Sequence, residues 1–167
     1  MRHIISILVQ NEAGVLSRVS NLFSSRGYNI ESLNVAPTAD TKVSRVTLVT
    51  RGSDPVIEQI TKQLGKLIDV VAITDLTSFD HIERELALFK VHMVNGRVEE
   101  LTRIVAQSSA RILDDHQGHY TIEFIGGSQE VDRFMERIAA TGRLTTVVRG
   151  GAMAVARGAP VFGRGTR

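Results

Sequence analysis

The sequence contains no cysteine and no tryptophan, and aromatic residues make up only 5% of its 167 residues. The absence of cysteine excludes disulfides, thiol nucleophiles and cysteine-ligated zinc or iron–sulfur sites. Few aromatic side chains are present to stack on nucleic-acid bases. No apolar run approaches the roughly 18 residues that a membrane span needs, and residues 1–10 lack the pattern of a secretion signal. We therefore expect a cytoplasmic protein with no membrane association.

Basic charge is scarce outside the C-terminal segment. The formal net charge is +2, yet Arg149 to Arg167 holds four of the 20 basic residues and none of the 18 acidic ones. A domain that binds phosphates would carry its positive charge on its body. No nucleic-acid partner is therefore expected. The segment GAPVFGRGTR is interpreted as a frayed end or a partner contact rather than an RNA-binding tail.

Hydrophobic residues make up 43% of the chain, and their spacing switches repeatedly between strand and helix periods. Gly27 is placed to end the first helix, and Asp54 before Pro55 is predicted to cap the second. The order is β-α-β-β-α-β, the split βαβ pattern. In the first half the predicted strands are 3–10, 30–35, 43–50 and 69–76, and the predicted helices are 15–23 and 56–67.

The second half repeats this order with almost no sequence identity. We therefore predict an α+β protein with two tandem ferredoxin-like domains, at residues 1–77 and 86–167, joined by a polar linker at 78–85. The Gly/Arg-rich tail is expected to add a short strand at 152–156 and then to fray. The other predicted strands are 86–93, 110–114, 119–125 and 144–148, and the predicted helices are 98–105 and 128–138.

The second strand of the first domain is expected to lie at a sheet edge, because the ferredoxin-like strand order is 4-1-3-2. Its residues Ile30 to Val35 include no lysine and no proline that would discourage pairing with another strand. Domains of this size also bury only about 60% of their unfolded surface, which favours association. We predict that two copies pair through this edge into one sheet.

The segment Gln10 to Leu16 is the most informative for function. A helix start offers unpaired N–H groups and the positive end of the dipole, where a carboxylate binds. Gly14 lets a ligand approach the amides of Gly14, Val15 and Leu16. Asn11 adds a side-chain amide, which can accept from an ammonium group and donate to a carboxylate. The same segment is also compatible with an ordinary turn followed by a helix.

A second side-chain amide, Asn29, stands where the second strand begins. An apolar wall for a short aliphatic side chain could come from nearby residues of the helix and the strand. Together these groups suit a free amino acid, although Asn29 is also compatible with an ordinary loop position. The candidate wall residues are Val15, Leu16, Ile30, Val35 and Ala36.

The strings NEAGVLSRVSNLF, SRGYNIESLNVAPT and SRVTLVT resemble the small regulatory subunit of acetolactate synthase, also called acetohydroxyacid synthase. The resemblance is dense over residues 1–77 and continues through LIDV and HIEREL. It implies that the first domain is an ACT domain, a ferredoxin-like module that binds amino acids between protomers. GYNIESL with VAPT is specific to this family, whereas Asn-x-x-Gly-Val-Leu occurs in many ACT domains.

The resemblance implies a non-catalytic subunit that binds valine as a feedback signal in branched-chain amino acid biosynthesis, with leucine and isoleucine as further candidate effectors. It would bind the large catalytic subunit, raise its activity and confer inhibition. Thiamine diphosphate, magnesium and FAD are expected on that subunit, and no cofactor on this chain. An alternative is a stand-alone ACT-type sensor that regulates a different enzyme.

The resemblance also assigns effector-binding roles. Asn11 and the Gly14 amide region match the loop that holds the effector's polar end, which extends to Val15 and Leu16. Asn29 and Ile30 match the contribution of a neighbouring protomer, and Ala36 matches a position that lines or supports the pocket.

No catalytic or metal site is predicted. The group Asp114, Asp115, His116 and His119 has no recognised zinc spacing and is interpreted as a solvated turn. Gly126-Gly127-Ser128 lacks the lysine of a P-loop and is interpreted as a helix cap. An acyl-phosphate enzyme would need Arg18 and Asn11 to converge on one anion, but Arg18 is expected to face solvent.

Overall fold

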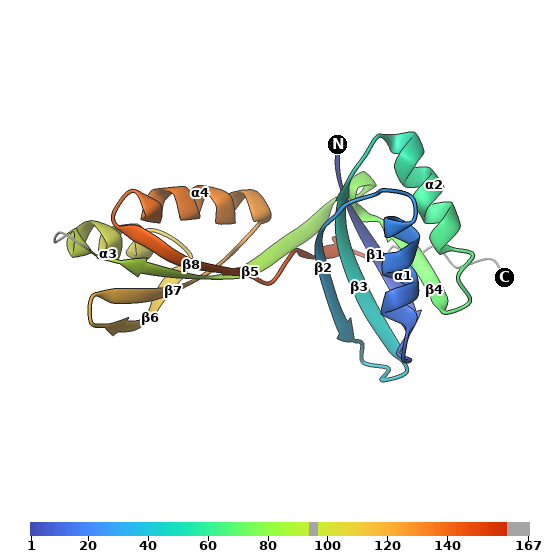
Figure 1. Ribbon diagram of the computed structural model, residues 1–167, viewed down its shortest axis with the longest axis horizontal. Coiled ribbons are helices and arrows are strands. Elements are labelled where there is room, and N and C mark those ends of the chain that lie inside the picture. Colours follow the sequence, from blue (N-terminus) through green and yellow to red (C-terminus); the bar gives the residue numbers. More distant parts are fainter. Residues whose placement is uncertain (94–96, 160–167) are drawn as a thin grey trace. The chain divides into compact units, whose positions relative to one another are not determined.

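The computed structural model describes residues 1–93 and 97–159. Two compact units are present: the first comprises residues 1–82 together with the segment from Ala152 onward, and the second comprises residues 83–151. Figure 1 shows that each unit is one sheet with two helices on one face. The predicted α+β class with two ferredoxin-like βαββαβ arrangements is confirmed.

The first unit has the sheet order β2-β3-β1-β4, all antiparallel, as predicted. A short 3-10 helix, η1, follows β4, and the edge strand β2 includes Pro37 as its last residue. The elements are β1 (Arg2–Gln10), α1 (Val15–Ser24), β2 (Ile30–Pro37), β3 (Val43–Arg51), α2 (Asp54–Leu64), β4 (Val70–Asp75), η1 (Leu76–Ser78) and β9 (Met153–Ala156).

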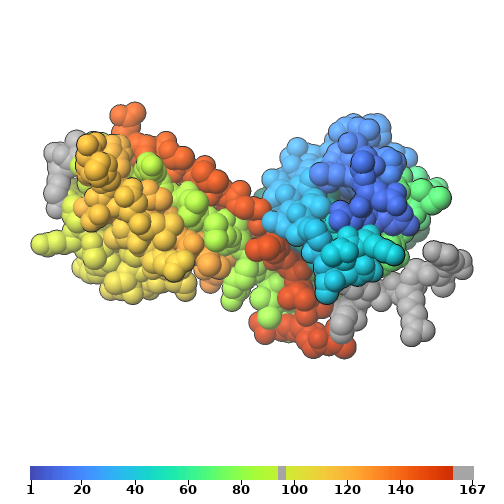
Figure 2. Space-filling view, turned by 90° about the horizontal axis from the view of Figure 1, so that it is seen from below, coloured from blue at the N-terminus to red at the C-terminus, as the bar shows by residue number. Residues whose placement is uncertain are grey.

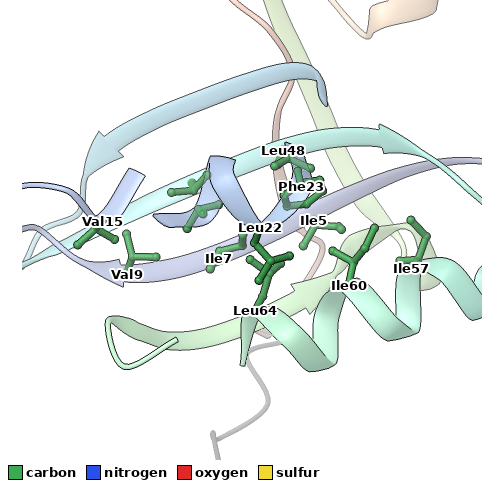
Figure 3. Packing of buried hydrophobic residues seen from close by; sticks show 12 residues of the cluster. Ile5, Ile7, Val9, Val15, Leu22, Phe23, Leu48, Ile57, Ile60 and Leu64 are labelled. Atoms are coloured by element: carbon green, nitrogen blue, oxygen red, sulfur yellow. The ribbon is translucent and has the colours of Figure 1, made fainter. Parts of the chain in front are cut away.

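The core of the first unit lies between the sheet and its two helices. Strand β1 alternates its side chains between the two faces, and Figure 3 shows its apolar residues opposite those of α1 and α2. On α1, buried positions recur at helical spacing, so one stripe faces the sheet. The residues labelled there are Ile5, Ile7, Val9, Val15, Leu22, Phe23, Leu48, Ile57, Ile60 and Leu64.

The turn that ends helix α1 contains Gly27, the glycine predicted for this position. Gly27 has φ 71°, a conformation that costs glycine little. The Gly27 amide donates to the Ser24 carbonyl at 3.1 Å, and the Tyr28 amide donates to the Phe23 carbonyl at 3.0 Å. These two bonds form a Schellman motif, which reverses the chain and starts β2.

The start of α2 differs from the prediction by one residue. Ser53 is the N-cap residue, with extended backbone, and Asp54 is the first helical residue. The Ser53 carbonyl accepts from Val56 and Ile57 at 2.9 and 3.1 Å. Asp54 then lies in the first helical turn, where its charge opposes the helix dipole favourably.

The segment after residue 151 differs more strongly from the prediction, which placed it in the second domain. Ala152 and Ala154 are buried in a cluster with Ile4, Val49 and Leu76 of the first unit. Ile4 and Val49 are cross-strand neighbours on β1 and β3. The small alanines let the segment lie close to this sheet face, and Figure 2 shows it, in red, against the first unit. The predicted fraying of residues 160–167, and the interpretation of that tail, lie outside the described residues.

The first unit is therefore completed by its own C-terminal strand, and a truncation tests this. Ending the chain after Gly151 exposes Ile4, Val49 and Leu76 and is expected to lower the free energy of unfolding of the first unit by about 2 kcal/mol. For a unit of this size, that corresponds to roughly 8–16 °C in its Tm by thermal unfolding. Ending after Ala159 keeps β9 and should leave the Tm unchanged. Equal Tm values for both truncations would contradict the role of β9.

The second unit has the sheet order β6-β7-β5-β8. Strand β5 starts at His81, so part of the predicted linker 78–85 is strand. Phe134 of α4 stacks on Phe124 with ring centroids 4.4 Å apart and is tilted against Phe89 at 5.8 Å. The elements are β5 (His81–His92), α3 (Val98–Ala106), β6 (Ala110–His116), β7 (His119–Gly126), α4 (Ser128–Ala139) and β8 (Arg143–Arg149).

The acidic and histidine-rich segment, residues 114–119, lies in the hairpin formed by β6 and β7. Gln117 and Gly118 form its loop, with φ 52° and 75°, the positive values typical of a two-residue type I′ turn. Asp114, Asp115 and His116 lie on β6 and are exposed, and His119 opens β7. Within residues 1–93 and 97–159, no group of three or more His, Cys, Asp or Glu side chains is arranged to hold a metal ion.

Helix α4 begins at Ser128, and Gly127 is its N-cap residue. The Gly127 amide donates to Glu130 Oε2 at 2.7 Å, while the Ser128 amide donates to Glu83 Oε1 at 3.2 Å. Carboxylates from this chain therefore occupy the start of α4. The Gly-Gly-Ser segment is a helix cap, in agreement with its interpretation from the sequence.

Candidate functional site

Gly14 opens α1 in a left-handed conformation, with φ 84° and ψ −10°. The backbone turns there from the end of β1 into the helix, and its carbonyl already accepts the Arg18 amide at 3.0 Å. A side chain at this position would be strained, because L-residues avoid this region. The backbone conformation alone therefore favours glycine at this position.

The amide groups at the start of α1 are largely unused by the protein. The Val15 amide has only a long contact, 3.4 Å, to the Glu12 carbonyl. Within the described part of the chain, the amides of Gly14 and Leu16 have no hydrogen-bond acceptor. No side chain caps this helix. The start of α1 consequently presents free donors and positive dipole to solvent.

Asn11 fixes the loop that leads to these amides. Its backbone amide donates to the Lys42 carbonyl at 2.8 Å, and its side-chain Nδ2 donates to the Thr41 carbonyl at 2.9 Å. The loop is thereby tied to the β2–β3 connection. With Nδ2 engaged, the Asn11 side chain has its carbonyl oxygen left to accept a hydrogen bond, a role that suits an ammonium group.

The predicted apolar wall is only partly available. Val15 is 3% exposed and packs in the core, so only its backbone can contribute to a ligand site. Leu16 is 42% exposed and Val35 is 41% exposed. Ile30 is half-buried against the core, and Ala36 is exposed on β2.

Asn29 lies at the opposite end of the sheet from Gly14. Ile30 of β2 pairs with Thr50 of β3, which in turn pairs with His3 near the start of β1. Ala36 of β2 pairs with Arg45 of β3, close to the other end of β1, which finishes at Gln10. His3 and Gln10 are seven residues apart on β1, which is about 23 Å at roughly 3.3 Å per residue. A single copy of the chain therefore does not bring Asn29 and Asn11 together.

Arg18 is 45% exposed, in agreement with its predicted solvent-facing position, and it also makes an ion pair. Its Nε donates to Asp69 Oδ2 at 2.6 Å, and Asp69 is 6% exposed. An ideal Cβ built on Gly14 would lie 3.1 Å from Arg18 Nη1, so the guanidinium covers the glycine. Arg18 therefore lies beside the start of α1, and its contact with Asp69 was not predicted from the sequence. The four-residue step from Gly14 to Arg18, which places both on one helix face, was the available signal.

His3 is buried in the first unit and takes part in a network of polar contacts. His3 Nδ1 lies 2.9 Å from Asp75 Oδ2, and its Nε2 lies 3.6 Å from Asp54 Oδ1. Asp75 also accepts from the Thr77 amide, and Thr77 Oγ1 accepts from Ile4. This network attaches η1 to β1. It contains no nucleophile oriented by a base.

Two family models match successive parts of the chain. One, described as an AHAS small subunit-like ACT domain, covers residues 5–72, and the other, the small subunit of acetolactate synthase, covers residues 84–158. The Escherichia coli (strain K12) acetolactate synthase isozyme 3 small subunit is 42% identical over 158 residues, which are 95% of this chain and 97% of that protein. The chain belongs to the acetolactate synthase small-subunit family. This membership supports a regulatory-subunit role.

The family extends across distant organisms and includes a solved structure. A probable acetolactate synthase small subunit of Archaeoglobus fulgidus is 40% identical over 161 residues, covering 95% of this chain and 98% of that protein. The crystal structure of the acetolactate synthase small subunit of Thermotoga maritima superimposes with a TM-score of 0.85 at 33% identity, covering 95% of this chain and 99% of that one. In the described residues, no helix is long and apolar enough to cross a membrane.

Proposed function

We propose that this chain binds the large catalytic subunit of acetolactate synthase, raises its activity, and confers feedback inhibition by valine in branched-chain amino acid biosynthesis. Leucine and isoleucine are further candidate effectors. The observation that supports this proposal is the uncapped, glycine-opened start of α1 in a domain of the ACT type. Thiamine diphosphate, magnesium and FAD belong to the catalytic subunit in this proposal, which acts in the cytoplasm.

The effector would bind between two copies of the chain. Strand β2 is an edge strand of its sheet, and antiparallel pairing of β2 with β2 of a second copy reverses the strand ends. Asn29 and Ile30 of the second copy then lie beside Ala36 of the first, at the end of the sheet that carries Asn11 and Gly14. This pairing requires Asn11 and Asn29 to lie at opposite ends of the sheet within one copy, as they do.

Such a site couples effector binding to the state of the interface. An effector shifts the catalytic subunit only if it binds one state of the complex more tightly than the other. A typical coupling free energy is about 1–3 kcal/mol, or roughly 5–150-fold in affinity. Inhibition by valine, with activation in its absence, requires no catalytic group on this chain.

The decisive experiment combines binding and activity measurements on the full chain. Calorimetry should show saturable valine binding, and sedimentation should give the mass of a dimer at micromolar concentration. Acetolactate formation by the large subunit should rise when the chain is added and fall when valine follows. Absence of binding for valine, leucine and isoleucine would refute the effector role. Binding of valine without any effect on the large subunit would instead indicate a stand-alone sensor.

A further inference from the structure

The ion pair between Arg18 and Asp69 lies beside Gly14, at the start of α1. Asp69 is nearly fully buried, and its carbonyl accepts the Gln10 amide at 2.8 Å, so the residue is fixed to the end of β1. A buried carboxylate is costly without a charged partner. Arg18 supplies that partner through Nε at 2.6 Å. Asp69 therefore orients the arginine side chain relative to the loop.

The remaining donors of Arg18 face outward. The guanidinium carries five N–H groups in a planar fork, and Asp69 engages Nε. The Arg18 side chain is 45% exposed, and its Nη1 lies next to Gly14. Nη1 thus lies against Gly14, the residue that opens α1 and precedes its free amides. An arginine fork beside main-chain amides is a strong receptor for a carboxylate.

We infer that Arg18, oriented by Asp69, binds the α-carboxylate of the effector, and that this contact restricts the site to ligands with a free carboxylate. The inference rests on the proposed function and adds to it a specificity-determining residue and a positioning residue. The ammonium group of the effector would then face the carbonyl oxygen of Asn11. The class of ligand is a free α-amino acid, and amino-acid amides are excluded.

The alternative is that the Arg18–Asp69 pair only holds the loop in place. The two roles differ in their dependence on the ligand's carboxylate. Loss of a purely structural pair weakens every ligand of the site, whereas loss of a carboxylate contact weakens valine and leaves valinamide unaffected. Valinamide keeps the side chain and the ammonium group and replaces the carboxylate with a neutral amide.

Calorimetry of the full chain with valine and with valinamide tests the inference. The native chain should bind valine at least about tenfold more tightly than valinamide, since hydrogen bonds to charged groups have about that effect. Arg18→Gln should weaken valine binding about 10- to 100-fold and leave valinamide binding unchanged. Asp69→Asn should weaken valine binding by a smaller factor, because the arginine is less firmly oriented. Arg157→Gln, which removes an arginine paired with Asp80 in the same unit, is the matched control and should change neither ligand.

The outcomes separate the inference from the proposed function. Equal affinity of the native chain for valine and valinamide would overturn the role of Arg18, and this measurement needs no variant to fold. Equal weakening of both ligands by Arg18→Gln, or no weakening of valine, would also overturn it and leave the valine site standing. Failure of the native chain to bind valine would refute the proposed function and this inference together.

Discussion

Gly14→Asp is expected to abolish valine inhibition and to leave activation of the catalytic subunit intact. The substitution has two effects at the site. A Cβ at φ 84° is strained and lies 3.1 Å from Arg18 Nη1, so the guanidinium must move. The new carboxylate then offers Arg18 a partner within the chain and repels the carboxylate of the effector. We expect valine affinity to fall by at least about 100-fold, because a charged contact is lost and a repulsion is added.

Gly158→Asp is the matched control for this variant. Gly158 also has positive φ, 70°, and a Cβ there would meet no heavy atom within 4 Å. The Gly158→Asp substitution therefore introduces the same residue and similar backbone strain away from the site. Calorimetry with valine and the acetolactate assay should show native behaviour for Gly158→Asp. Retained valine inhibition in Gly14→Asp would contradict the location of the site.

Arg149→Ala is expected to lower the free energy of unfolding of the second unit by about 3 kcal/mol. Glu85 on β5 is 3% exposed and receives two hydrogen bonds from Arg149, Nε to Oε1 at 2.9 Å and Nη2 to Oε2 at 2.7 Å. Arg149 Nη1 also donates to Asp132 at 2.6 Å. Removing the arginine leaves a buried carboxylate without its charged partner, and chemical denaturation of the full chain would measure the loss.

The hydrogen bonds of Arg149 also affect its pKa. The hydrogen bonds that Arg149 donates to Glu85, followed by the one it donates to Asp132, raise the pKa of its guanidinium, while desolvation acts in the opposite direction. Arg149 consequently stays charged. Arg111→Ala is the control, since Arg111 pairs with Glu123 at an exposed position of the same sheet. It should cost clearly less free energy of unfolding than Arg149→Ala, because an exposed ion pair contributes little, and an equal cost for both variants would show that burial of Glu85 is unimportant.

The strand and helix order could be predicted from the sequence because hydrophobic spacing and local chain signals agree in both halves. The Schellman turn at Gly27 and the hairpin at Gly118 are local, so their residues are sufficient to predict them. The assignment of β9 was not predictable in this way. Ala152 and Ala154 carry too little periodicity to reveal a partner. The strand 3–10, apolar on both faces, indicated that its second face is covered, although it could not indicate by which segment.

At the candidate site, the backbone of the helix start could be predicted from the sequence, whereas the contact between Arg18 and Asp69 could not. The glycine-opened helix follows from residues that are adjacent in sequence. The Arg18–Asp69 pair joins residues 51 positions apart, and such a contact depends on how the helix is seated on the sheet. Val15 was expected to line the site, but it shares the buried stripe of Val19 and Leu22. The prediction relied on the position of Val15 at the start of the helix. Its burial is determined instead by the face of the helix on which it lies.

The last strand of the first unit has a consequence for how the protein is made. Residues 1–82 leave the ribosome first, but Ile4, Val49 and Leu76 acquire their cover only when Ala152 and Ala154 have been synthesised. Domains usually fold in the order of synthesis. Here the second unit, residues 83–151, is translated in between. The apolar face of the nascent first unit accordingly stays uncovered until Ala152 and Ala154 have been translated.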